Sequence, residues 1–139
     1  MPAVYTAAHL SLAVLEMLVH VPAEEDLPTD LVAIPADVPD GLGVEHISVD
    51  DLPPDWRRAP APAVLAERGT AWLTAARTAV LAVPSAVIPS ELNYILNPRH
   101  PDFRRIVLHR AERTDLDPRL RRARRALDAW RPSRGRRRP

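Results

Sequence analysis

Glu16 is the residue of this sequence whose surroundings best suit chemistry, because it stands inside the otherwise apolar stretch LAVLEMLV, residues 12–19. A carboxylate among apolar neighbours is costly unless it is paired or lines a cavity. An arginine or a backbone amide that satisfies this carboxylate would give a purely structural explanation. Carboxylates in such surroundings also concentrate in active sites, where they act as acids, bases or electrostatic groups. Both interpretations stay open at this point.

Four further side chains are candidates, and each also has a structural explanation. Ser85 follows an apolar strand at its carboxyl end, where ligands often bind in mixed folds, but a serine in a turn often bonds its own backbone. Tyr5 is one of two tyrosines, and a buried aromatic in the core is its simpler interpretation. Asn97 and His100 lie in the loop NPRHP, where side-chain-capped turns are common.

Short strands and helices must position these side chains. Residues 3–5 read as the end of a strand, and Thr6 is a suitable N-cap for a helix over residues 7–20. That helix is apolar nearly all round, which is typical of a buried helix. Further strands are expected at residues 31–34, 44–48, 80–83 and 106–109, and a strand or a turn at 93–96. An extended segment is expected at 87–88, a single turn at 50–52, and helices at 62–76 and 118–130. A break in the helix 62–76 is possible at Gly69.

The charge distribution divides the chain unevenly. Residues 1–103 hold 5 arginines against 14 acidic residues, whereas residues 104–139 hold 14 arginines against 4. We therefore expect one domain over residues 1–120, followed by a basic helical extension and a disordered Arg/Pro tail over residues 121–139. The arginine run has no interleaved aromatic residue beyond Trp130 and no recognised nucleic-acid-binding module, so a solvated tail is preferred to direct nucleic-acid binding.

Several common kinds of site are missing from the sequence. There is no GxGxxG or Walker loop for nucleotides, no HExxH or EF-hand spacing for metals, and no GxSxG around a serine. The chain has no cysteine, which excludes a thiolate metal site, and we expect no metal at all. No secretion signal is recognisable, and the longest apolar stretch, residues 10–21, is too short to cross a bilayer. A cytoplasmic location is expected.

Several separated motifs occur in the order found in one family. They are VYTAAHLSLAVLEMLVH, LPPDWR, AWL, VLAVPSAVIPSELNYILNPRHPDF and DPRL, which together run from Val4 to Leu120. This set resembles the RES-domain toxins, which pair with Xre-type antitoxins. The family name records an Arg, a Glu and a Ser. Glu16 and Ser85 match the Glu and the Ser, and Tyr5 matches a tyrosine that the family places in its pocket.

The resemblance implies an α+β fold, a mixed sheet with packed helices similar to ADP-ribosyltransferase toxins. It also implies a toxin of a type II toxin–antitoxin system that cleaves the nicotinamide–ribose bond of NAD+. In that context Glu16 would steady the sugar cation, Ser85 would bond the nicotinamide or ribose end, and Tyr5 would stack on the nicotinamide ring. Asn97 and His100 would contribute more distant or phosphate contacts. NAD+ would be the substrate rather than a resident cofactor, with inorganic phosphate as an optional co-substrate.

The chain departs from the family pattern at its start. The family's Arg lies in a segment resembling G-R-W-N before the VYT strand, whereas this chain begins at Met1. We therefore expect the first segment of the fold to be absent, and the 139-residue chain to have weak or no activity. An upstream in-frame stretch resembling G-R-W-N would favour an enzyme with a misassigned start, and a stop codon would favour an inactive remnant that only binds a partner.

The sequence leaves three functions open: an NAD+-degrading toxin, a remnant that only binds a partner, and a nucleic-acid-binding protein that uses its arginine tail. The resemblance also leaves open whether water, phosphate or a protein accepts the ADP-ribose. A protein acceptor would make the chain an ADP-ribosyltransferase. The resemblance further implies an antitoxin that occludes the active-site cleft, and a homodimer within that complex.

Overall fold

The computed structural model describes residues 2–21 and 27–120 of the chain. The predicted basic tail, and all but the first turn of the helix expected at 118–130, lie outside these residues. Within them the chain forms a four-stranded mixed sheet, two pairs of short strands and two α-helices. The predicted α+β class is therefore confirmed. No helix among the described residues has the length and apolarity that a bilayer crossing requires.

The main sheet has the strand order β1-β6-β5-β4. Its β1–β6 and β6–β5 pairs are antiparallel, and its β5–β4 pair is parallel. The strands are β1 (Val4–Ala7), β6 (Leu92–Leu96), β5 (Val80–Pro84) and β4 (Val44–His46). β5 is a continuous apolar run, buried at every position but Val83, because it is central in the sheet and covered on both faces.

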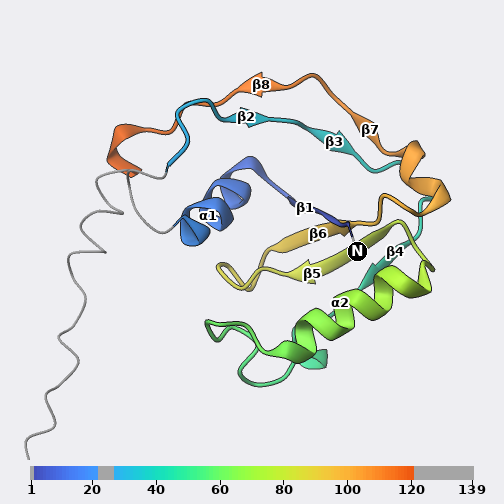
Figure 1. The fold of residues 1–139 in the computed structure, drawn as a ribbon. Coiled ribbons are helices and arrows are strands. Elements are labelled where there is room, and N and C mark those ends of the chain that lie inside the picture. Colours follow the sequence, from blue (N-terminus) through green and yellow to red (C-terminus); the bar gives the residue numbers. More distant parts are fainter. Residues whose placement is uncertain (1, 22–26, 121–139) are drawn as a thin grey trace, which may run out of the picture.

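Helix α2 and the paired short strands cover opposite sides of this sheet (Figure 1). α2 (Ala63–Ala75) runs without a break through Gly69, and it ends at Ala76 in the left-handed conformation, with a φ of 46°. Trp72 of α2 is 3% exposed, and its Nε1 donates to Thr78 Oγ1 at 3.1 Å. On the other side lie the pairs β2–β8 and β3–β7, whose strands are β2 (Val32–Ala33), β8 (Glu112–Arg113), β3 (Ala36–Asp37) and β7 (Val107–Leu108).

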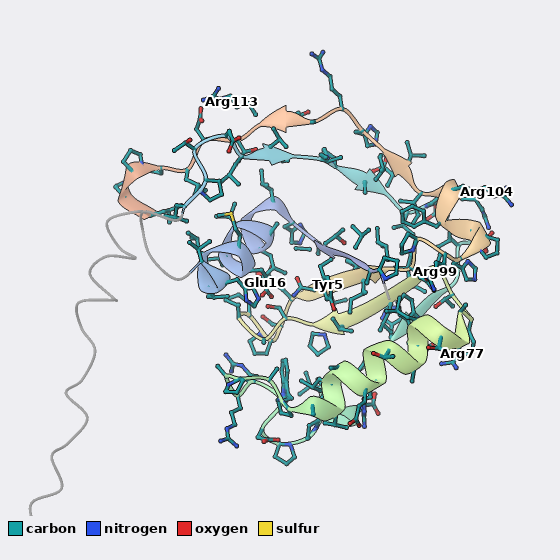
Figure 2. The ribbon with its side chains drawn as sticks, in the orientation of Figure 1. Tyr5, Glu16, Arg77, Arg99, Arg104 and Arg113 are labelled. Carbon is teal, nitrogen blue, oxygen red and sulfur yellow. The ribbon has the colours of Figure 1, made fainter. Side chains whose placement is uncertain are left out.

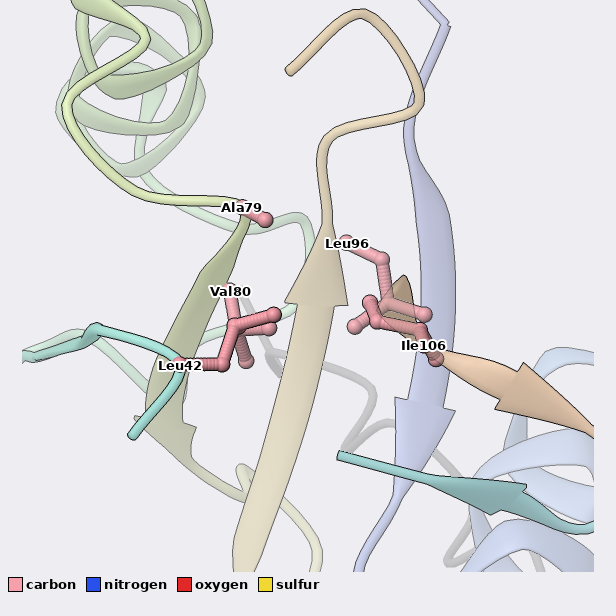
Figure 3. Packing of buried hydrophobic residues seen from close by; sticks show 5 residues of the cluster. All are labelled: Leu42, Ala79, Val80, Leu96 and Ile106. Atoms are coloured by element: carbon pink, nitrogen blue, oxygen red, sulfur yellow. The ribbon is translucent and has the colours of Figure 1, made fainter. Parts of the chain in front are cut away.

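The core is formed by residues of β5 and β6 together with residues just before β4, β5 and β7 (Figure 3). Its buried residues are Leu42, Ala79, Val80, Leu96 and Ile106. Two 3-10 helices, η2 (Val49–Asp51) and η3 (Pro101–Arg105), form the turns after β4 and before β7. This packing brings the carboxyl end of β5 and the start of β6 next to α1, where the candidate site lies.

Helix α1 (Leu10–His20) differs from its sequence prediction in two ways. β1 extends to Ala7, so the helix starts three residues later than expected, with His9 as its N-cap, and Thr6 instead donates its hydroxyl to Tyr94 O. The prediction of a buried helix was also wrong. Only Leu12 is buried, and Leu10 and Val19 are about half exposed, because neighbouring elements cover one side of the helix alone.

Two shorter segments also differ from expectation. Residues 87–88 bend instead of continuing as extended chain, because their backbone amides donate hydrogen bonds to Ser85 Oγ, just after β5. The two-residue strands β3 and β8 were not expected. They are too short to show a periodic pattern, and their pairing with β7 and β2 comes from the tertiary arrangement.

Candidate active site

Three side chains from three different elements meet at one carboxylate oxygen. Ser85 Oγ, after β5, donates to Glu16 Oε1 of α1 at 2.6 Å. Asn93 Nδ2, on β6, donates to the same oxygen at 2.6 Å. Among the described residues no donor is within hydrogen-bonding distance of the other oxygen, Oε2. The carboxylate that stood out in the sequence is thus bound at one oxygen by two side-chain donors.

Ser85 is completely buried, and its hydrogen-bonding capacity is filled. Its Oγ accepts the backbone amides of Val87 and Ile88, both at 3.0 Å, while its proton is directed to Glu16. Its own amide donates to Glu91 O at 2.9 Å, which closes the hairpin between β5 and β6. A serine whose acceptor positions are taken by two amides is suited to positioning Glu16, and poorly suited to acting as a nucleophile.

Asn93 is the member of this cluster that sequence reasoning missed. It pairs with Ala7 of β1 and Val83 of β5, so it belongs to the middle of the sheet. The orientation of its amide is dictated by its surroundings, because turning it over would place two acceptor oxygens 2.6 Å apart. The available signal was a polar amide inside the strand sequence LNYIL, which is otherwise apolar or aromatic.

Tyr5 lies on the same face of the sheet as Asn93. In β1 it is two residues before Ala7, the register partner of Asn93, and alternate residues of a strand share a face. Its side chain is 77% exposed, so it is no core aromatic. Figure 2 shows the Tyr5 and Glu16 side chains on the same side of β1. The contact between Glu16 and Ser85 lies at the end of the sheet where β5 finishes, whereas Tyr5, level with Ile95 and Leu81, lies further along the same face toward the other end.

A cavity of about 840 Å³ lies apart from this cluster, bounded by α1, β1 and the strands β2 and β3, with a mostly apolar lining. Tyr5 borders it, but Glu16, Ser85 and Asn93 do not. We place the candidate site at the polar cluster, because chemistry requires polar groups at defined positions and size alone does not supply them.

Asn97 and His100 are not brought to this cluster. They follow β6 at its far end, about 13 Å along the strand from Asn93 at the usual rise per residue. Asn97 is 1% exposed, donates to Leu73 O and accepts from the amide of Arg99. His100 Nδ1 accepts from the amide of Asp102 and caps η3. Both geometries are those of side-chain-capped turns, and a ligand-binding role for either residue stays a prediction.

Replacing Asn97 by alanine is therefore expected to lower stability and leave chemistry unchanged. The substitution strands the buried carbonyl of Leu73 and the amide of Arg99, which costs about 1–3 kcal/mol in the free energy of unfolding. Urea unfolding measures that loss. Any enzymatic rate, expressed per folded molecule, is expected to stay within about twofold of the parent. A selective loss of rate in a fully folded variant would instead give Asn97 a direct role.

Arg57 is a second functional candidate that only the structure reveals. Its Nε donates to Ala86 O at 2.9 Å, which places its exposed guanidinium beside the loop that follows Ser85. Arg119, in the DPRL segment, pairs instead with Asp117, and its hydrogen bonds hold the pKa of that carboxyl below its usual value. The described residues contain no group of three His, Asp or Glu side chains placed to hold a metal ion.

The sequence motifs and this geometry agree with a comparison against known families. Residues 1–132 match the RES domain. The chain belongs to the RES-domain family. A RES-domain protein of Photorhabdus laumondii, Toxin Res, is 42% identical over 107 residues, which cover 76% of this chain and 67% of the relative. Toxin Res of Yersinia enterocolitica is 38% identical over 101 residues, or 73% of this chain and 65% of the relative.

One relative carries a more specific name. The Prs ADP-ribosylating toxin of a Sphingobium species is 36% identical over 119 residues, which cover 84% of this RES-domain chain and 73% of the relative. The family resemblance inferred from the motifs is thereby confirmed. The roles of Tyr5, Glu16 and Ser85 stay predictions, to which the structure adds a contact between the last two.

Proposed function

We propose that this RES-domain protein is a toxin that cleaves the nicotinamide–ribose bond of NAD+. The observation that carries the proposal is the Glu16 carboxylate, held at Oε1 by Ser85 and Asn93 at 2.6 Å each, with an exposed tyrosine on the same face of the sheet. The toxin names of its relatives support the biological role. The ADP-ribosylating name of one relative supports NAD+ as the substrate.

The reaction needs a fixed negative charge more than it needs an acid. When the bond between ribose C1′ and the nicotinamide nitrogen breaks, its electron pair goes to the nitrogen and nicotinamide leaves neutral. The positive charge then lies on the sugar as an oxocarbenium ion, as in glycoside cleavage. A carboxylate that is already oriented stabilises this ion without having to reorganise during the reaction. We assign that role to Glu16, with Oε2 directed to the sugar.

Two other side chains fit other parts of the same substrate. The exposed ring of Tyr5 offers a surface on which the flat nicotinamide ring can stack. The guanidinium of Arg57, beside the Ser85 loop, offers positive charge to the pyrophosphate of NAD+. Ser85 serves the substrate through Glu16 in this proposal, because its hydroxyl already makes three hydrogen bonds.

A second candidate is ADP-ribosyl transfer to a protein, which the name of the Sphingobium relative favours. Both functions share the loss of nicotinamide, and they differ only in which nucleophile then attacks C1′. Water would give ADP-ribose, phosphate would give ADP-ribose 1″-phosphate, and a protein side chain would give a modified protein. Binding of an Xre-type antitoxin, a homodimer and a cytoplasmic location remain predictions from the family resemblance.

The test is to incubate the purified protein with NAD+, with and without inorganic phosphate, and to follow nicotinamide release. The assay uses this chain and the chain extended in frame to any upstream start codon, because the family's Arg is expected before Val4. We expect nicotinamide release by the active form, and mass spectrometry of the products identifies the acceptor. Intact NAD+ in both preparations, with and without a cell lysate as a source of protein acceptors, would overturn the proposal.

A further inference from the structure

Two buried acceptor atoms next to the Glu16 cluster lack hydrogen-bond partners among the described residues. They are Glu91 Oε2 and Asn93 Oδ1. The two residues are two positions apart at the start of β6, where the bond from Ser85 N to Glu91 O continues the ladder of the sheet. Glu91 immediately precedes the strand, and its carbonyl bond to Ser85 places its backbone beside the residue that meets Glu16.

Folded proteins leave few buried polar atoms unsatisfied, so a pair at one site calls for an explanation. Asn93 cannot satisfy its oxygen by turning its amide over, because its Nδ2 is committed to Glu16. Glu91 likewise has both backbone groups engaged in the hairpin, with its amide donating to Ile88 O and its carbonyl accepting from Ser85. Asn93 Oδ1 is thus fixed as an acceptor, and Glu91 Oε2 is buried on a fixed backbone, with the donors to both still to come from a ligand.

We infer that Glu91 and Asn93 form the subsite for the nicotinamide carboxamide, accepting its two N–H groups. The inference rests on the proposed function. An amide –NH2 carries two donors that point apart, which suits acceptors on two different residues, here two positions apart in the chain. The sugar hydroxyls are left to Glu16 Oε2, and the carboxylate of Glu91 also complements the cationic ring. Because both oxygens are shielded from water, the side chains around them must shift when the ligand enters.

The first test compares substrates of the unaltered protein, so it does not depend on a variant that folds. In 3-acetylpyridine adenine dinucleotide a methyl group replaces the –NH2, and the ring keeps its charge and a comparable leaving group. A site built to bond an N–H group rejects analogues that lack it. We expect kcat/KM for this analogue to be at least about 10²-fold below that for NAD+. Equal values for the two dinucleotides would overturn the subsite.

The second test shifts the preference of the protein between two dinucleotides. Nicotinic acid adenine dinucleotide presents a carboxylate where NAD+ presents the carboxamide, and Glu91 would repel it. In Glu91→Gln the new side-chain –NH2 can donate to that carboxylate, so the ratio of kcat/KM for the acid to that for NAD+ is expected to rise at least about tenfold. The matched control is Glu45→Gln, the same change in an exposed ion pair with Arg77, which is expected to leave the ratio unchanged.

The outcomes separate this inference from the function on which it rests. Cleavage of NAD+ with an unchanged ratio in Glu91→Gln, in a variant whose circular dichroism and urea midpoint match the parent, would remove Glu91 from the subsite and leave the proposed function standing. Failure to cleave NAD+ at all would overturn both. Rejection of the acetylpyridine analogue together with the shifted ratio would establish the carboxamide contact.

Discussion

Glu16→Gln is expected to reduce nicotinamide release from NAD+ by about 10³-fold while the protein stays folded. Glutamine keeps an oxygen that can accept from Ser85 Oγ and Asn93 Nδ2, so the local hydrogen bonds survive. What is lost is the negative charge that opposes the sugar cation in the transition state. The charge matters more for the transition state than for binding, so we expect kcat to fall far more than KM rises.

Steady-state kinetics measure the fall in kcat, and urea unfolding of the same preparation measures whether the variant stays folded. Glu45→Gln again serves as the control, because it removes a partly exposed carboxylate on β4 that pairs with Arg77 and not with the Glu16 cluster. We expect that variant to match the parent in rate and to lose at most about 1 kcal/mol of stability. Full activity in a folded Glu16→Gln protein would show that the charge is not needed, and the proposed mechanism would then be abandoned.

Ser85→Ala is expected to have the second-largest effect, on stability and activity together. The substitution strands the buried amides of Val87 and Ile88, which lowers the free energy of unfolding by about 2–4 kcal/mol. It also removes one of the two donors that hold Glu16. A displacement of about 1 Å in a catalytic group can cost about 10²-fold, so nicotinamide release from the folded fraction is expected to fall by that order.

The control for this prediction comes from the same loop. Ser90 is exposed, so Ser90→Ala is expected to change stability by less than about 0.5 kcal/mol and to leave the rate intact. A double variant tests whether Ser85 acts through Glu16. If it does, Glu16→Gln with Ser85→Ala releases nicotinamide no more slowly than Glu16→Gln alone. Fully additive losses would mean that Ser85 contacts the substrate independently.

The sequence alone was sufficient to predict those helices, strands and residues that have a strong local signal. The short apolar run of β5 and the longer apolar stretch of α1 predicted a strand and a helix close to where they lie. The isolated carboxylate singled out Glu16, and the ordered motifs identified the family that the RES domain match confirms. These features could be predicted because each depends on residues that are neighbours in the chain.

The composition of the site was decided by tertiary structure. Glu16 lies 69 residues from Ser85 and 77 from Asn93, so their contact depends on the β1–β6–β5 register and on where α1 packs. Asn93 and Glu91 gave no strong local signal, since a polar residue in a short strand is as often at the surface as in a site. Only the register shows that Asn93 shares a face with Tyr5.

The same reason explains the error about the burial of α1 and the separation of Asn97 from the cluster. Apolarity all round predicted that α1 would be buried, but exposure depends on what packs against a helix, and here one side is covered. Asn97 and Ser85 both follow strands in similar Pro-rich sequence, yet they lie at opposite ends of the β5–β6 pair. Sequence by itself determined which groups could do chemistry. The antiparallel pairing of these strands decided which of them meet, because side chains react across space and not along the chain.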